Sequence, residues 1–146
     1  DTERSWLDSF VEEFLLELET TRMNKLYKMP VFEALIEDGE LKIKTNLKEI
    51  GISFMNFYKE NPRFQKDLNN KKHESWQDWE LKRFMREARI NPVKFLSRRK
   101  FFNYNEINKE FSLNQKLEKF IDHDLSGHFK DIVRLRKLRY YNRRLK

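Results

Sequence analysis

The sequence contains no cysteine, which excludes disulfide bonds, thiolate zinc sites and cysteine nucleophiles together. A chain without cysteine is typical of intracellular proteins, so we expect a cytoplasmic location. Long apolar runs are also missing, because none approaches the ~18 residues that a membrane-spanning helix needs. We therefore expect no membrane partner.

Glycine and proline are scarce, with three residues of each, so the chain has few sites for tight turns and helices are favoured over hairpins. Its 146 residues fit one domain, and 38% of them are hydrophobic. The sequence therefore predicts an all-α or mainly α fold, with residues 1–146 forming a single compact multi-helix domain. A helical pattern begins at once and without an initiator methionine, so we expect a domain excised from a larger protein.

Apolar residues at helical spacing predict a series of helices along the chain. The expected ranges are Thr2 or Ser5 to Glu19, 21–37 with a kink or break before Pro30, 47–58 after an N-cap at Asn46, 75–91, a short helix opened by Pro92, 105–111, 112–122, and a basic helix that follows a break at Ser126 and Gly127. Residues 63–74 are polar and are expected to form a mobile loop. The only β prediction is a small winged-helix-like element near residues 40–44, where apolar and basic residues alternate.

The net charge of +7 is concentrated in the last seventeen residues. Residues 130–146 hold eight basic residues against one acidic residue, whereas residues 1–129 balance at 23 of each sign. Apolar residues are interleaved with these cations, so we expect a helix that docks on the core with one face and presents arginines with the other. A local excess of positive charge usually has a polyanionic partner.

Catalytic motifs are hard to find. Asp122, His123, Asp124 and His128 form a cluster with no established metal-ligand spacing, and polar residues at a helix junction explain it better. Glu40 and Lys42 resemble part of a metal-dependent nuclease core, but the segment before them is predicted to be helical, and a polar turn explains them better. Glycine-rich phosphate loops are absent. We expect no catalytic residue, no metal site and no cofactor, and therefore no enzymatic activity in this segment.

Binding to nucleic-acid phosphates is the best supported function, because arginine and lysine release counterions when they neutralise phosphates. The candidate contact residues are Arg134, Arg136, Lys137, Arg139, Arg143 and Arg144 in the last helix, with Arg98, Arg99, Lys100, Lys25 and Lys28 elsewhere. The chain alternates arginines with Tyr140 and Tyr141, and such rings can stack on exposed bases. For the two tyrosines, however, anchoring the helix to the core is the favoured interpretation.

Several segments resemble a known family. Thr21 to Pro30, followed by Val31 to Ile36, resembles the segment "T-x-M-T-K-S-Y-K-x-x-L-L-x-A-L-L" in accessory regions of superfamily II DEAD/DEAH-type helicases, several of them in bacterial restriction or phage-defence enzymes. The similarity continues through 47–58, 91–96 and 131–144, although Leu26 stands where the pattern has serine. The resemblance implies a C-terminal helical accessory domain that contacts DNA or the motor of an ATP-driven enzyme.

Together these observations predict a non-catalytic nucleic-acid-binding accessory domain, with DNA or RNA and the rest of the parent helicase or restriction enzyme as partners. The alternative is a protein-interaction domain that docks on the motor or on a partner subunit. A third reading, a stand-alone nuclease that uses Glu40 and Lys42, is not expected.

Overall fold

The computed structural model describes residues 10–23, 25–68 and 73–145. The α-helices are α2 (Phe10–Thr20), α3 (Lys28–Glu33), α4 (Leu47–Lys59), α5 (Leu81–Ala88), α6 (Lys94–Leu96) and α7 (His123–Tyr140). The strands are β1 (Ile36–Glu37), β2 (Glu40–Leu41), β3 (Lys44–Asn46), β4 (Phe102–Asn105) and β5 (Glu110–Leu113). The 3₁₀ segments are η1 (Pro62–Leu68), η3 (Trp76–Asp78) and η5 (Gln115–Phe120), and the π-helical segments are η4 (Arg89–Val93) and η6 (Tyr141–Leu145).

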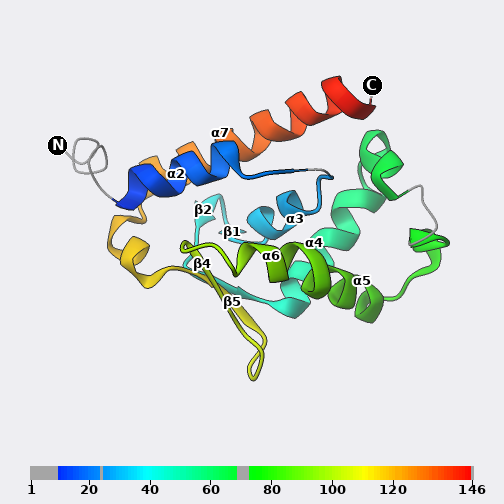
Figure 1. The fold of residues 1–146 in the computed structure, drawn as a ribbon, viewed down its shortest axis with the longest axis horizontal. Helices are drawn as coiled ribbons and strands as arrows, with labels where there is room; N and C mark the ends of the chain where they lie inside the picture. The colour runs from blue at the N-terminus through cyan, green and yellow to red at the C-terminus, as the bar shows by residue number, and fades with distance from the viewer. Residues whose placement is uncertain (1–9, 24, 69–72, 146) are drawn as a thin grey trace.

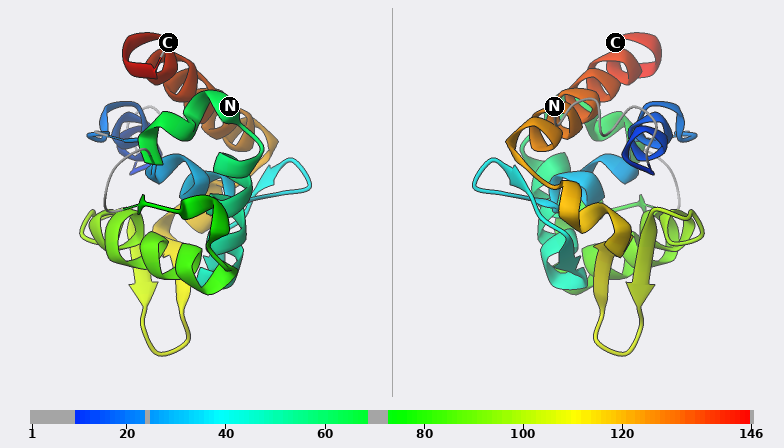
Figure 2. Two further views of the ribbon diagram at one scale, coloured as in Figure 1. Left: turned by 90° about the vertical axis from the view of Figure 1, so that its right-hand side faces the viewer. Right: turned by 90° about the vertical axis from the view of Figure 1, so that its left-hand side faces the viewer.

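The prediction of a mainly α-helical fold is confirmed, and two small antiparallel sheets accompany the helices. Helices α2 and α7 lie side by side along one edge of the molecule, and the β4–β5 hairpin projects from the opposite edge (Figures 1 and 2). No helix in the described part of the chain has the length and hydrophobicity to cross a bilayer.

The predicted first helix is confirmed from Phe10 onward, and it ends at Thr20. Its predicted start at Thr2 or Ser5 lies outside the described residues. Val11, Phe14 and Leu18 are buried, which is the stripe that helical spacing predicts. The Phe14 ring contacts the Phe129 ring of α7 at 6.2 Å between centroids, so α2 and α7 share a core contact.

The prediction of a helical region over 21–37 is largely wrong. Among the described residues of this range, only Lys28–Glu33 is helical. Pro30 lies in the first turn of this helix, where its lack of an amide hydrogen costs no helical hydrogen bond. The chain then turns at Asp38 and Gly39 and forms the β1–β2 hairpin. Lys28 closes the preceding loop, because its Nζ donates hydrogen bonds to Thr21 Oγ1 (2.9 Å) and to the Arg22 carbonyl (2.7 Å).

The β element predicted near residues 40–44 is divided between two sheets. Glu40–Leu41 pairs with Ile36–Glu37, whereas Lys44–Asn46 pairs with β5 in a three-stranded sheet of order β3-β5-β4. Helix α4 follows β3 directly. Its predicted N-cap is confirmed, since Asn46 Oδ1 accepts a hydrogen bond from the Glu49 amide at 2.8 Å.

The helices predicted over 105–111 and from Ser112 are wrong, because residues 102–113 form the β4–β5 hairpin. Its four-residue tip is held by asparagine side chains. Asn105 Oδ1 accepts hydrogen bonds from the amides of Ile107 (2.9 Å) and Asn108 (3.3 Å), and Lys109 takes a positive φ of 58°. Only Gln115–Phe120 of the second predicted helix is helical, as a 3₁₀ segment.

Two predicted breaks are also wrong. Helix α5 continues through Pro92, because the wider π-helical turn η4 accommodates a residue without an amide hydrogen, and α6 follows without interruption. Helix α7 begins at His123, with Asp122 Oδ1 capping the Leu125 amide at 2.8 Å, and it runs through Ser126 and Gly127. Ser126 is buried there, and its Oγ accepts a hydrogen bond from the Leu41 amide.

The polar stretch 63–74 is more ordered than predicted. Residues 62–68 form η1, in which Phe64, Asp67 and Leu68 are buried, while residues 69–72 lie outside the described part. The helix predicted over 75–91 begins with the short 3₁₀ segment η3, and its α-helical part, α5, starts only at Leu81.

Helices α4 and α5 approach each other closely at Gly51, which predicts a measurable effect of one added carbon. A Cβ at Gly51 would lie 2.4 Å from Met85 Cγ and 3.3 Å from Met85 Cα, whereas a Cβ at Gly127 of α7 would meet nothing within 4 Å. Both substitutions to alanine gain the same helix propensity, up to about 1 kcal/mol. We therefore expect Gly127→Ala to stabilise the fold and Gly51→Ala to destabilise it by roughly 1–2 kcal/mol. Urea unfolding of both variants checks this, and equal stability of the two would contradict the close packing.

Candidate nucleic-acid interface

Cations from three separate segments meet beside the carboxyl-terminal end of α2. Lys28 lies within electrostatic reach of Arg99 and Arg136, and Arg136 within reach of Arg139 and Arg143. Two adjoining grooves that share Arg22, Lys28 and Phe95 add Lys25 on one side and Arg98 on the other. We call this surface the basic belt; its members are Arg22, Lys25, Lys28, Arg98, Arg99, Arg136, Arg139 and Arg143.

The last helix is docked on the core, as its pattern predicts. Phe129, Val133, Tyr140 and Leu145 are buried, which leaves Arg139, Arg143 and Arg144 exposed on the other side. Among residues 10–23, 25–68 and 73–145, no carboxylate forms an ion pair with these three arginines. Their guanidinium groups are therefore available to an external anion on an ordered surface.

Arg136 has a structural role that its neighbours lack. It is half-buried, and its Nη1 donates a hydrogen bond to the Leu18 carbonyl at 3.0 Å, which ties α7 to the end of α2. Burial, followed by repulsion from Arg143 and Arg139, lowers the pKa of its guanidinium. Arg139 and Arg143 are therefore close enough to Arg136 to interact with it electrostatically.

Lys28 is also a partly buried cation inside the belt. Its pKa is lowered first by burial and then by Arg136 and Arg99, while Glu17 acts in the opposite direction. An anion bound in the adjoining groove would relieve this repulsion, because an opposite charge favours the protonated amine.

The cluster of Arg98, Arg99 and Lys100 is partly neutralised by α2. Arg99 donates to both carboxylate oxygens of Glu17, at 3.0 Å and 2.9 Å, and Lys100 pairs with Glu13 at 3.2 Å. The carboxylates of α2 that form ion pairs in the described part therefore contact this cluster and not α7. Arg98 is exposed and lies over the Phe95 ring, with its Cζ 5.2 Å from the centroid.

Phe95 is the residue of this surface that sequence reasoning missed. Its side chain is 46% exposed and lines both grooves of the belt, so an aromatic face lies among cations, as in surfaces that stack single-stranded bases. The sequence places Phe95 only in the short helix opened by Pro92. Its place in both grooves depends on contacts between distant segments, which helical periodicity does not encode.

Arg134 and Lys137 lie away from the belt. They line a groove between α7 and α3 with Glu33 and Ile36, where Lys137 Nζ pairs with Glu33 Oε1 at 2.5 Å. Arg134 pairs with Asp131 of its own helix at 3.7 Å. Arg144 lies over the Tyr140 ring, with its Cζ 5.8 Å from the centroid. Arg134, Lys137 and Lys100, which pair with carboxylates, are therefore weaker candidates for phosphate contact than the exposed arginines for which the described part shows no ion pair.

Tyr140 anchors the last helix, in line with the interpretation favoured from the sequence. It is only 2% exposed, and its hydroxyl donates a hydrogen bond to Asp67 Oδ1 at 2.8 Å. Burial, followed by this hydrogen bond, raises the pKa of the Tyr140 hydroxyl. Tyr141 is half-buried and packs its ring on Phe64 at 6.2 Å. Tyr140 therefore presents no free ring face to a base.

The two polar clusters weighed as catalytic sites lie next to each other, at the contact between His123 and Glu40. Asp122 caps α7, and His123 Nδ1 lies 2.9 Å from Glu40 Oε1. Lys42 pairs with Glu49 at 2.9 Å, so Glu40 and Lys42 have different partners. Within the described ranges, no group of three metal-ligating side chains comes together.

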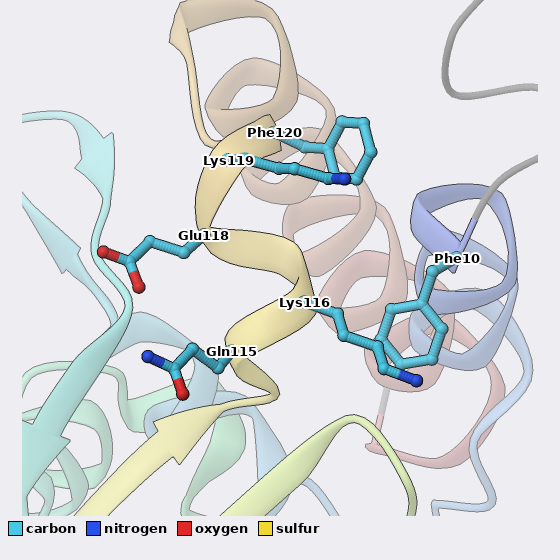
Figure 3. A pocket seen from close by; sticks show the side chains of 6 residues that line it. All are labelled: Phe10, Gln115, Lys116, Glu118, Lys119 and Phe120. Atoms are coloured by element: carbon cyan, nitrogen blue, oxygen red, sulfur yellow. The ribbon is translucent and has the colours of Figure 1, made fainter.

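A second pocket with aromatic and basic residues lies between α2 and η5 (Figure 3). Its lining includes Phe10, Lys116, Lys119 and Phe120. The Lys116 and Lys119 ammonium groups lie 5.6 Å and 5.1 Å from the Phe10 and Phe120 ring centroids. The protein's own lysines therefore cover these rings, as Arg98 covers the Phe95 ring in the basic belt.

No protein-family model matches the chain, and no curated protein or solved structure shows significant similarity to it.

Proposed function

We propose that the chain is a non-catalytic nucleic-acid-binding domain that holds DNA through its phosphates, as an accessory part of a helicase or restriction-type enzyme. The observation that carries the proposal is the basic belt, in which cations from α7, from the loop before α3 and from the end of α6 lie next to one another. Contacts of this kind fix the position of a nucleic acid without reading its sequence.

The topology supports a finer assignment, a winged-helix arrangement. In chain order the elements are α3, β3, α4, the continuous helix from α5 to α6, β4 and β5, and the strands pair in the order β3-β5-β4. Three helices, of which the second and third pack closely, with a hairpin after the third, are the parts of a winged helix-turn-helix domain. The wing in this assignment is the β4–β5 hairpin and not the segment near residues 40–44.

The parent enzyme is proposed from the resemblance alone. The residues that carry it lie in the loop before α3, in α3, in α4, in η4 with α6, and in α7 with the start of η6, so they include elements of the winged-helix arrangement and part of the belt. An accessory domain with these surfaces would position DNA for a linked motor.

Protein interaction is the alternative, and one observation favours it. The groove between α3 and α7 has Ile36, Phe129 and Val133 in its lining, surrounded by Lys130, Arg134 and Lys137. A partner segment with apolar and acidic side chains would fit this groove. Co-purification with a motor fragment at high salt, with no DNA binding by the domain, would support this alternative.

Wild-type protein is expected to bind DNA with strong salt dependence. Each neutralised phosphate contributes about −0.9 to the slope of log K against log salt for duplex DNA, so four contacts predict a slope of roughly −3.6. Fluorescence anisotropy with labelled duplex between about 50 and 200 mM salt measures this slope. Absence of binding at the low-salt end, or binding that salt does not weaken, would contradict the proposal.

A further inference from the structure

The outer face of α5, together with the first residue of the following turn η4, carries a row of cations that the basic belt does not include. Lys82, Arg86 and Arg89 are spaced at i, i+4 and i+7, which places them along one side of the helix over about 10 Å. Phe84 and Ala88 face the core and are fully buried, whereas Lys82 and Arg86 are exposed. From Leu81 to Leu96 the chain has five basic residues and one acidic residue, so this helix is strongly cationic.

The β4–β5 hairpin adds a projecting ribbon beside this row. Its tip holds Ile107, which is 95% exposed, between polar and charged neighbours. The tip is built rigidly, because asparagine side chains bond its amides, including Asn108 Oδ1 to the Glu110 amide at 3.2 Å. The tip is also tied to the first residue of α4 by a hydrogen bond of 2.9 Å from the Leu47 amide to the Lys109 carbonyl. Among the large hydrophobic residues of the described part, Ile107 is the most exposed.

The helix and the hairpin meet at one ion pair. Arg89 Nη1 lies 3.8 Å from Glu106 Oε1 at the start of the hairpin tip. The Tyr104 hydroxyl is close enough to interact electrostatically with both groups, and it is buried with no hydrogen-bond partner among the described residues. The row on α5 and the hairpin tip therefore belong to one surface. In Figures 1 and 2 the hairpin projects from the edge of the molecule opposite α7.

We propose that this surface, the α5–hairpin face, binds double-stranded DNA, with α5 in the major groove and the hairpin tip in a neighbouring minor groove. The proposal rests on the proposed nucleic-acid function and adds the form of the ligand. An α-helix with its side chains is about 10–12 Å across and fits the major groove of about 12 Å. Lys82, Arg86 and Arg89 supply the positive charge along the groove, and an apolar residue such as Ile107 is the kind that minor-groove proteins insert between bases.

Arg83 is not assigned to this face. Its Nε pairs with Glu87 at 2.9 Å, and its guanidinium lies 4.6 Å from the Trp79 ring centroid, so its own chain satisfies it. Glu106 belongs to this face, but its charge is unfavourable for DNA. It is an exposed carboxylate beside Arg89, and its charge opposes an approaching phosphate while it holds the guanidinium in place.

The Arg89–Glu106 ion pair offers a test in which neutralising each partner changes the duplex affinity in opposite directions. Arg89→Gln should weaken duplex binding by about tenfold, the loss expected for one charged groove contact. Glu106→Gln should strengthen duplex binding by about threefold, because it removes a repulsive charge and releases Arg89 for the ligand. If the ion pair had a purely structural role, both variants would lose stability, and duplex binding would weaken in both. Duplex anisotropy at fixed low salt, with thermal unfolding of each variant beside it, measures both effects.

Two further variants test the ligand and the hairpin. Lys82→Gln with Arg86→Gln should weaken duplex binding more than binding to single-stranded DNA, and Ile107→Ser should weaken duplex binding without lowering the melting temperature. The control removes three exposed cations elsewhere, in Lys48→Gln, Lys119→Gln and Lys130→Gln. Suppose that the wild type binds DNA. If the Lys82→Gln, Arg86→Gln variant then loses duplex and single-stranded affinity equally, or keeps its duplex affinity, the inference about the α5–hairpin face is wrong while the proposed function stands. A wild type that binds neither form of DNA would overturn the proposed function as well.

Discussion

Replacing Asp67 by alanine is expected to lower the free energy of unfolding by roughly 3–5 kcal/mol. Asp67 is fully buried in η1, and its carboxylate accepts hydrogen bonds from the Leu26 amide (2.8 Å), the Tyr58 hydroxyl (3.2 Å) and the Tyr140 hydroxyl (2.8 Å). These donors belong to the loop before α3, to α4 and to α7. Alanine would leave three buried donors without this acceptor, and each such loss costs about 1–3 kcal/mol.

The controls separate hydrogen bonding from charge. Asp67→Asn keeps an acceptor oxygen and should cost much less than alanine, while Tyr140→Phe removes one donor and should cost about 1 kcal/mol. Urea unfolding followed by tryptophan fluorescence measures all three. Alanine and asparagine variants of equal stability would show that these hydrogen bonds contribute little.

The same carboxyl group gives stability a dependence on pH. Burial raises the pKa of Asp67 above its ordinary value of 3.8, although the Leu26 amide and the Tyr140 hydroxyl oppose the shift. The folded state therefore binds this proton more tightly than the unfolded state, and the contribution of Asp67 to stability falls as pH rises through the folded pKa. Relative to Asp67→Asn, the wild type should gain stability as the pH is lowered from about 7 to about 4. A constant difference between the two proteins would contradict the shift.

Charge reversal in the basic belt is expected to have the largest functional effect. Lys25→Glu, Arg98→Glu, Arg139→Glu and Arg143→Glu together should weaken DNA binding by more than about a hundredfold, since four attractive contacts become repulsive. All four side chains are exposed, and the described part shows no ion pair between any of them and a carboxylate. Lys25 interacts electrostatically with the buried Asp67, so we expect some loss of stability from Lys25→Glu, and folding of the variant is verified beside binding. Arg136 is left unchanged because it holds the Leu18 carbonyl.

The matched control changes four exposed lysines outside the belt, Lys48, Lys116, Lys119 and Lys130, to glutamate. It alters the net charge by the same amount. Affinity measured by anisotropy, with circular dichroism to verify folding, distinguishes a specific surface from general positive charge. Similar losses in the two variants would mean that no particular surface holds the DNA.

The sequence predicted those parts of the fold that depend on local pattern. The amphipathic faces of α2, α4 and α7 were predicted, as was the cap at Asn46, because helical spacing and capping act within a few residues. The β4–β5 hairpin was missed, since its turn depends on Asn105 and Asn108 side chains and not on glycine or proline. The continuation of the helix through Pro92 was missed because a π-helical turn cannot be distinguished from a break in the sequence.

The candidate site was predicted in composition but not in arrangement. Arg139 and Arg143 were found because charge is concentrated in the last segment, and Lys25, Lys28 and Arg98 were proposed to join them. Whether they meet depends on contacts between distant segments, such as that of Arg136 with Leu18. The pairing of Arg99 with Glu17 and the exposure of Phe95 likewise come from tertiary packing, which no local pattern encodes.

The claim that the exposed arginines at the end of α7 bind phosphates is tested most directly by the salt dependence of a double variant, Arg139→Gln with Arg143→Gln. If each arginine neutralises one phosphate of duplex DNA, the slope of log K against log salt should become less steep by about 1.8. A slope identical to that of the wild type, whatever the change in affinity at one salt concentration, would show that these two cations do not contact the nucleic acid.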